Sequence, residues 1–191
     1  MKTLHIFTEE QSAKNVFETI VPPLLPDGVT LRVYQHQGKQ DLEKAIVTAI
    51  PSISKIPGSV ILITQDQDNE DCKVVKKKIV DLLDNKCVCI YFVRIVCREL
   101  ESWFLGDLRA IQKAYPRFKH ENYINRTDFK NVDAISKPNN YLLRIIPEYS
   151  GREKLPKLEA SERISKCLDI HNNTSESFNQ TLSAIRRLIA S

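Results

Sequence analysis

One stretch, residues 60–73 with the sequence VILITQDQDNEDCK, restricts the fold of this chain more than any other. It begins with an unbroken apolar run rich in β-branched residues, which is typical of a strand buried on both faces of a parallel sheet. The run passes almost at once into a loop with four acidic residues, which are Asp66, Asp68, Glu70 and Asp71. Because ligands of open α/β sheets bind beyond the carboxyl ends of the strands, the stretch predicts carboxylates at a functional edge.

Asp66 and Asp68 are central to this prediction. They are two residues apart, so in extended chain both side chains are expected to leave from the same face. Paired carboxylates repel each other unless a cation, a proton or an arginine lies between them, and Mg²⁺ takes oxygen ligands of this kind. The alternative is structural, because Asp68, Glu70 and Asp71 also suit the start of the helix predicted over residues 74–83.

The first half of the chain alternates between strand and helix patterns. The predicted elements are strand 4–7, helix 12–20, strand 29–34, helix 39–50, strand 60–64, helix 74–83 and strand 87–96. Such alternation predicts an α/β fold with a parallel sheet that is flanked by helices.

After residue 96 the pattern becomes helical. One helix is predicted from residue 98 towards residue 114, with a core stripe of Leu100, Phe104, Leu108 and Ile111. Residues 116–138 are polar and basic and predict a long loop or short irregular helices, and three further helices are predicted at 141–149, 158–168 and 177–189. We therefore expect an α/β core over residues 1–115 and a mostly helical C-terminal extension over residues 116–191, packed on that core.

Composition sets outer limits on function. The chain has 191 residues and a net charge of +4, a mild excess that permits a polyanionic partner without arguing for one. Its five cysteines form no CxxC pair, which predicts free thiols in a reducing cytoplasm and no zinc site. The start has no signal-peptide pattern, and no apolar stretch approaches the ~20 residues of a membrane span, so we expect a cytoplasmic protein with no membrane partner.

Acidic residues follow three of the predicted strands. The carboxyl ends of parallel strands meet at one edge of a sheet, so these side chains are expected to converge there. The three acidic clusters are Glu9 and Glu10, then Asp66, Asp68 and Asp71, and finally Glu99 and Glu101. This convergence favours a metal site over a chance distribution of surface charge.

A glutamate after the first strand and Asp-x-Asp after the third resemble the Toprim pattern of topoisomerases, primases and several nuclease families. Glu9, Asp66 and Asp68 match it. The resemblance implies a Toprim-like (Rossmann-like) sheet, Mg²⁺ binding at these positions and phosphodiester chemistry. The chain has Glu10 after Glu9, where many Toprim domains have glycine. Both glutamates therefore stay candidate ligands, and Glu9 is favoured because it lies closer to the strand.

Three longer strings resemble the DUF4276 family over nearly the whole chain: DQDNEDCK at 66–73, RIVCRELESWFLGDL at 94–108 and NNTSESF at 172–178. This is a bacterial family of unassigned function with Toprim-like features, often found beside an AAA-type ATPase. The resemblance implies a Mg²⁺-dependent nuclease or nucleic-acid-processing effector in anti-phage defence, with that ATPase as a partner. The family's motif positions correspond here to Glu9, Asp66, Asp68, Asp71, Cys72, Lys73, Arg98, Glu99, Glu101, Trp103, Asp107, Ser175, Ser177 and Phe178.

The acidic residues receive the following roles in this hypothesis. Glu9, Asp66 and Asp68 hold one or two Mg²⁺ or Mn²⁺ ions, with Glu10 and Asp71 as further candidate ligands. Either Glu99 or Glu101 completes a second metal site or acts as a base.

The basic residues near the acidic loops are candidates for phosphate contacts. Lys73, Lys76 and Arg98 would bind phosphate oxygens of nucleic acid. The alternatives are a solvated helix face for the two lysines and a structural ion pair of Arg98 with Glu101 or Asp71.

Several other family positions have structural interpretations. Trp103 is expected in the core of an amphipathic helix, and Cys72 is expected as a packing residue. Ser175 is expected to cap the last helix, which Ser177 and Phe178 begin, and Asp107 suits either a helix surface or a hydrogen-bond acceptor behind the site.

Two other functions compete with a nuclease. The chain is alternatively a non-catalytic partner or sensor subunit that binds an ATPase, or a phosphohydrolase that acts on a small phosphate compound. It has no GxxxxGKS loop, which excludes ATP hydrolysis by the P-loop route. The sequence leaves the oligomeric state open.

Overall fold

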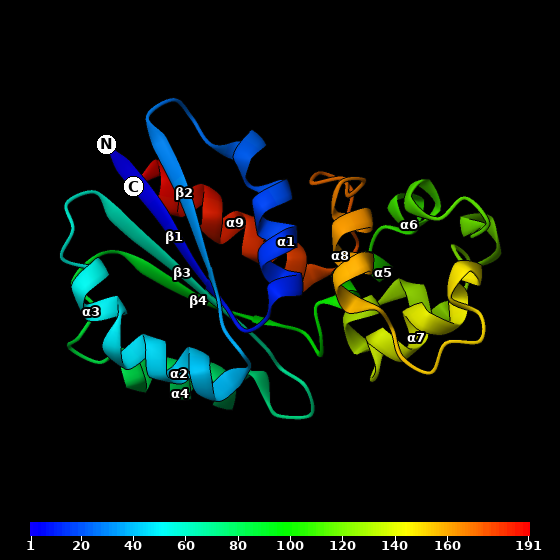
Figure 1. The fold of residues 1–191 in the computed structure, drawn as a ribbon, viewed down its shortest axis with the longest axis horizontal. Helices are drawn as coiled ribbons and strands as arrows, with labels where there is room; N and C mark the ends of the chain where they lie inside the picture. Colours follow the sequence, from blue (N-terminus) through cyan, green and yellow to red (C-terminus); the bar gives the residue numbers. More distant parts are fainter.

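The computed structural model describes residues 1–191 and contains a four-stranded parallel sheet between two layers of helices (Figure 1). The strands lie in the order β2-β1-β3-β4, and all three neighbouring pairs are parallel. Their bounds are β1 Lys2–Thr8, β2 Val29–Gln35, β3 Ser59–Asp66 and β4 Tyr91–Val96. The predicted α/β class with a parallel sheet is therefore confirmed, and the architecture is consistent with a Toprim-like or Rossmann-like fold.

The helices follow the predicted order closely. The α-helices are α1 Gln11–Ile20, α2 Lys39–Thr48, α3 Ile50–Ile53, α4 Cys72–Leu83, α5 Glu101–Leu105, α6 Leu108–Ala114, α7 Pro138–Ile145, α8 Lys157–Ser165 and α9 Glu176–Ala190. Short 3-10 helices lie between them: η1 Pro22–Leu24, η2 His120–Asn122, η3 Thr127–Lys130, η4 Val132–Ala134 and η5 Pro147–Tyr149. None of the helices combines the length and apolarity that a membrane span requires.

The apolar run of β3 divides its side chains between two hydrophobic cores. Val60 and Leu62 point into a large core that includes α1 and α9, while Ile61 and Ile63 point into a smaller core with α2, α3 and α4. Figure 1 shows these two helical layers on opposite faces of the sheet. The strand is therefore buried on both faces, as its unbroken apolar sequence predicts.

The last helix, α9, packs against the sheet although it lies far from the strands in sequence. Its residues Leu182, Ile185 and Leu188 belong to the same core as Leu4 and Leu62 of the central strands. Figure 1 shows α5 to α8 beside the sheet, with α9 returning to it and ending near the N-terminus. Residues 116–191 are mostly helical and pack on the core, while the predicted boundary after residue 115 stays a prediction.

Several predicted elements differ from the structure in their bounds, and two of the differences have a clear description. The helix expected over residues 98–114 is divided into α5 and α6 by Gly106 and Asp107. A side chain at Gly106 would collide with Asn173, and the Asp107 carboxylate caps α6 by accepting a hydrogen bond from the Ala110 N–H (2.9 Å). The strand expected from residue 87 begins only at Tyr91. The expected core stripe is correct, because Leu100, Phe104, Leu108 and Ile111 are all buried.

The strand order places a topological switch point between β1 and β3. From this central pair the chain proceeds outward to β2 on one side and to β4 on the other. In open α/β sheets, the crevice beyond the carboxyl ends of the strands at such a point is the usual binding site. Glu9 directly follows β1 and Asp66 ends β3, so both predicted acidic positions lie at this crevice.

Candidate functional site

Hydrogen bonds connect the ends of β1, β3 and β4 through two carboxylates. The Glu9 carboxylate accepts a hydrogen bond from the Asp66 N–H, with Oε2 and N 3.3 Å apart. The Asp66 carboxylate accepts one from the Leu100 N–H in the segment after β4, also at 3.3 Å. The predicted convergence of acidic residues after three strands is thus present, and Glu9 and Asp66 form its centre.

Glu101 adds a third carboxylate at the first position of α5. Its side chain is 1% exposed, and its Oε2 atom has no hydrogen-bond partner. A buried carboxylate oxygen without a partner is costly unless a proton, a cation or a ligand compensates the lost hydration. Glu101 is therefore the least satisfied acidic group of the site.

A small internal cavity lies against Glu9 and Asp66. Glu9, Glu10 and Asp66 line its polar side, and the rings of Phe17 and Trp103 line its apolar side. Its volume is about 10 Å³, which is close to the room that one water molecule needs. Trp103 is fully buried and donates to the Ser177 hydroxyl (2.8 Å), so its predicted place in the core is correct.

Burial raises the pKa values of the three central carboxylic acids. It raises the pKa of Glu9 to about 7, although the hydrogen bond from the Asp66 N–H acts in the opposite direction. Burial likewise raises the pKa of Glu101 to about 7, against the attraction of Lys157. The pKa of Asp66 is raised well above its usual range by burial and then by repulsion from Glu101 and Glu9. Titration near neutral pH is typical of functional sites.

Lys157 of α8 supplies positive charge to this acidic site. Its Nζ lies 3.4 Å from Oε2 of Glu10. Burial alone would lower the pKa of Lys157, but the charges of Glu101, Glu10 and Asp66 outweigh it and raise this pKa. Because Glu10 is already paired with Lys157 and accepts from the Ser12 hydroxyl (3.3 Å), Glu9 is the better candidate for a free ligand.

A second lysine, Lys39, begins α2 and pairs with the loop after β3. Its Nζ lies 2.8 Å from an Asp68 oxygen and 3.3 Å from a Glu70 oxygen. Neither Lys39 nor Lys157 was predicted as part of the site. Lys39 closely follows β2, so its place at the site was predictable from the rule that the ends of parallel strands converge. Nothing in the local sequence pattern places Lys157 at the sheet.

Asp68 does not share a face with Asp66, contrary to the expectation from extended chain. The strand ends at Asp66, and Asp68 has a left-handed backbone with φ of 53°. Its N–H donates to the Arg98 carbonyl (2.7 Å), and its exposed carboxylate pairs with Lys39. The turn therefore separates the two aspartates, with Asp66 at the internal cavity and Asp68 at the surface.

Glu99 and Asp68 lie along a neighbouring polar groove. The groove has a volume of about 230 Å³, and its other lining residues include Lys137 and Asn140. The Glu99 carboxylate also accepts a hydrogen bond from the Asn139 N–H at the start of α7 (3.0 Å). The predicted acidic residues thus form two adjacent groups, an internal one and one at an open groove.

The predicted phosphate-binding residues lie away from the internal cavity. Lys73 and Lys76 line a separate groove beside β4, together with Arg94 and Cys97. Arg98 donates from Nη1 to the Asp68 carbonyl (3.3 Å) and has no carboxylate partner, so the alternative interpretation, an ion pair with Glu101 or Asp71, is wrong. The structure does not bring these three basic residues together with Glu9 and Asp66.

Asp71 caps α4, in agreement with the structural alternative. Its Oδ1 atom accepts hydrogen bonds from the N–H groups of Lys73 (2.7 Å) and Val74 (3.2 Å). Ser175 caps α9 in the same way, through the Phe178 N–H (3.1 Å). Asp71 is therefore removed from the central group of candidate metal ligands by its role in the helix.

We expect Asp71→Ala to destabilise the protein by about 1 kcal/mol, because two N–H groups of α4 lose their acceptor. Metal binding and any cleavage activity should remain unchanged. Chemical denaturation measures the first effect and isothermal titration the second. Asp71→Asn keeps a capping oxygen and serves as the control; loss of metal binding in both variants would return Asp71 to the ligand set.

The central residues fit a Mg²⁺ ion in chemistry but not yet in arrangement. No group of three or more His, Cys, Asp or Glu side chains is arranged so that it could hold a metal ion. Glu9, Asp66 and Glu101 nevertheless offer the oxygen ligands that Mg²⁺ takes, and one Glu101 oxygen has no other partner. Binding would therefore require these carboxylates to move closer, with the cation replacing the proton that their raised pKa values favour.

The candidate carboxylates all lie within a region that is similar to one protein family. The profile of that family, described as a domain of unknown function (DUF4276), matches residues 8–186. The chain belongs to the DUF4276 family. This confirms the resemblance seen in the three sequence strings. No curated protein and no solved structure shows a match to the chain.

Proposed function

We propose that this DUF4276 protein is a Mg²⁺- or Mn²⁺-dependent enzyme that hydrolyses phosphodiester bonds in nucleic acid. The observation that carries the proposal is the buried, unpartnered Glu101 oxygen after β4, whose charge acts on Asp66. Asp66 in turn lies with Glu9 at the switch point of the parallel sheet. Buried carboxylates without enough positive charge favour a divalent cation. The order of acidic residues along the strands, Glu9 and then Asp66, also supports kinship with Toprim domains.

Each residue of the site has a distinct role in this proposal. Glu9, Asp66 and Glu101 would hold the ion, which supplies Lewis acidity and lowers the pKa of a bound water. Lys157 and Lys39 would stabilise negative charge on phosphate oxygens.

Glu99 is the candidate general base, in preference to Glu101. It lies in the open polar groove, where it is able to accept a proton from an attacking water. Glu101 is almost fully buried and suits a ligand better than a proton carrier.

The polar groove is the proposed approach for the substrate. Its lining offers amide and hydroxyl groups that suit the sugar-phosphate backbone of a nucleic acid. These residues are Asn69, Ser136, Asn139 and Asn140, with Lys137 as the one basic side chain. A role in bacterial anti-phage defence with an AAA-type ATPase partner rests on the family resemblance alone.

Metal-dependent cleavage is the direct test. Purified protein is incubated with plasmid DNA, single-stranded DNA, RNA or p-nitrophenyl phosphate in Mg²⁺, in Mn²⁺ or in EDTA, while isothermal titration measures metal binding. We expect cleavage of at least one nucleic acid with either metal and none in EDTA. Turnover of p-nitrophenyl phosphate alone would favour a phosphohydrolase, and cleavage in EDTA would contradict the proposal.

The lysine pairs support a second candidate, a non-catalytic partner or sensor subunit of an ATPase. Lys157 and Lys39 already neutralise Glu10, Asp68 and Glu70 without a metal ion. A protein that binds no Mg²⁺ even with an oligonucleotide present, but forms a stable complex with the ATPase, would fit this function.

A further inference from the structure

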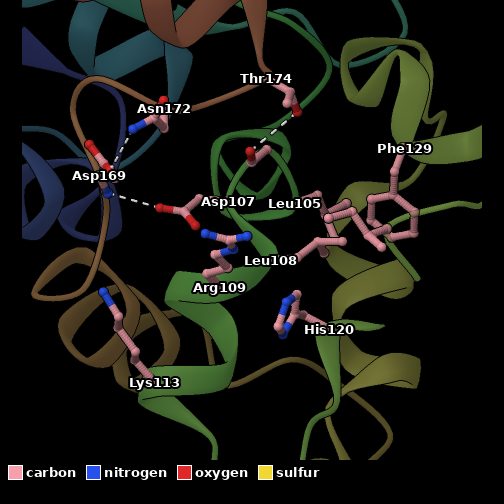
Figure 2. A pocket seen from close by; sticks show the side chains of 12 residues that line it. Leu105, Asp107, Leu108, Arg109, Lys113, His120, Phe129, Asp169, Asn172 and Thr174 are labelled. Atoms are coloured by element: carbon pink, nitrogen blue, oxygen red, sulfur yellow. Dashed lines mark hydrogen bonds between the residues drawn. The ribbon is translucent and has the colours of Figure 1, made fainter. Parts of the chain in front are cut away.

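A second and much larger cavity lies at the far end of α5 from Glu101. It has a volume of about 490 Å³, which is within the range of small-molecule sites. Leu105 and Gly106 at the end of α5 and several residues of α6 line it, whereas Glu9, Asp66 and Glu101 do not. We refer to it as the α6 cavity, marked by Arg109, Lys113, His120 and Phe129 (Figure 2).

Two cationic side chains of α6 lie along this cavity without a protein partner. Arg109 and Lys113 are exposed and one helical turn apart, and neither forms an ion pair or a hydrogen bond. Like charges at this spacing repel each other and destabilise a helix. An anion between them would relieve that repulsion and gain two charge-assisted hydrogen bonds.

The acidic residues of the cavity do not supply that anion, because their oxygens already accept hydrogen bonds from backbone N–H groups and from the Asn172 side chain. The Asp107 carboxylate accepts from the N–H groups of Ala110 (2.9 Å) and Asp169 (2.8 Å). The Asp169 carboxylate accepts from the His171 N–H (2.8 Å) and the Asn172 amide (3.0 Å). Figure 2 shows the contact of Asp107 with Asp169 and the contact of Asp169 with Asn172. These two carboxylates hold the loop before α9 against α6.

The opposite wall of the cavity is apolar. Figure 2 shows Leu105 and Phe129 across the cavity from Lys113. Ile124 also lines it and is 52% exposed, so about half of this large apolar residue is open to solvent. A flat apolar group would bury this surface, which favours binding in proportion to the area removed from water.

His120 provides a polar group between these two sides. Its Nδ1 lies 2.7 Å from Oε1 of Gln112, an acceptor, so Nδ1 carries the proton. In the neutral ring, Nε2 is then left as an acceptor for a hydroxyl or amino group of a ligand. The α6 cavity thus combines a cationic side, an apolar wall and a hydrogen-bond acceptor.

We propose that the α6 cavity binds a nucleotide. The phosphate lies between Arg109 and Lys113, the base lies against Leu105, Ile124 and Phe129, and His120 accepts from the sugar or the base. The ligand is either a free mononucleotide or the 5′-phosphorylated end of a nucleic-acid strand, since both present the same chemistry. This proposal does not depend on the metal site, because the two sites share no residue.

Isothermal titration of the full-length protein tests this proposal. The ligands are AMP, GMP, CMP, UMP, inorganic phosphate, adenosine and a 5′-phosphorylated oligonucleotide. We expect at least one nucleotide or the oligonucleotide to bind at least tenfold more tightly than phosphate or adenosine. Binding of the oligonucleotide alone identifies the strand end as the source, and binding of mononucleotides identifies the free compound.

Substitutions then locate the binding. Arg109→Ala and Lys113→Ala should each weaken binding about tenfold or more, because each removes a charged hydrogen bond. Ile124→Asp should weaken it as well, since a carboxylate replaces part of the apolar wall at an exposed position. Arg186→Ala removes the same charge from the exposed surface of α9 and is expected to change affinity less than twofold.

Three results would contradict the proposal. The first is that no nucleotide or strand end binds, and the second is that phosphate and nucleotide bind with equal affinity. The third is that both Arg109→Ala and Lys113→Ala bind as tightly as the wild-type protein. Asp66→Asn keeps the α6 cavity intact and should bind the nucleotide normally. Failure of the metal-site proposal is thereby distinguished from failure of this one.

Discussion

Asp66→Asn is expected to lower metal-dependent cleavage by at least about a hundredfold, because loss of a direct metal ligand exceeds the effect of losing an outer-shell group. Asparagine has nearly the same shape, and its oxygen is still able to accept the hydrogen bond from the Leu100 N–H (3.3 Å). The fold should therefore survive, and only the charge at the switch point is lost. A cleavage assay with the substrate that the wild-type protein degrades provides the measurement.

The same substitution should stabilise the metal-free protein. Burial and the charges of Glu101 and Glu9 disfavour ionised Asp66, so removing its acidic group removes a cost of folding at neutral pH. We expect the melting temperature in EDTA to rise by at least about 3 °C, which corresponds to about 1 kcal/mol for a domain of this size. Lower activity with higher stability is the signature of a group retained for function.

Asp71→Asn is the matched control for Asp66→Asn. It makes the same chemical change in the same loop, but at a position where the carboxylate only caps α4. Activity and melting temperature should both stay close to the wild-type values. Full cleavage by Asp66→Asn would exclude the metal mechanism, and a lower melting temperature would show that Asp66 is not repelled by its neighbours.

The stability of the metal-free protein is expected to fall as the pH rises from about 4.5 to about 7. Glu101 has a pKa of about 7 in the folded state, whereas its ordinary pKa of 4.5 applies in the unfolded chain. Between these values the folded state binds more protons, so the free energy of unfolding decreases with increasing pH. The shift in the pKa of this buried group corresponds to about 3 kcal/mol in the free energy of unfolding. This contribution is present below pH 4.5 and is fully lost above pH 7. Glu9 adds a smaller effect in the same direction, because its side chain is more exposed.

Urea unfolding between pH 5 and pH 8 measures this dependence. Glu101→Gln should remove much of it, while Glu99→Gln, two positions earlier, should preserve it. Saturating Mg²⁺ should restore stability at pH 8, because a ligand that binds only the folded state stabilises it by mass action. An unchanged pH profile in Glu101→Gln would show that Glu101 does not titrate in the folded protein near neutral pH.

Much of the sheet and its acidic edge was predictable because the signals are local. The short, β-branched apolar run before Asp66 is typical of a strand with both faces buried, and parallel strands carry the residues that follow them to one edge. Glu9 and Asp66 therefore meet as predicted. The helix N-caps formed by Asp71 and Ser175 were also predictable from the sequence, because each cap joins a side chain to an N–H group two or three residues ahead.

The amino-acid sequence by itself thus determined the parallel α/β fold, the carboxylates at its edge and the caps of its helices. The tertiary structure alone decided which of these groups share a site. The left-handed turn at Asp68 moves its carboxylate onto Lys39, and α8 brings Lys157 to Glu10 from 147 residues away. The α6 cavity likewise forms where α6 meets the loop before α9. Local patterns record periodic burial and capping, whereas these contacts depend on how distant segments pack, which no short window of sequence encodes.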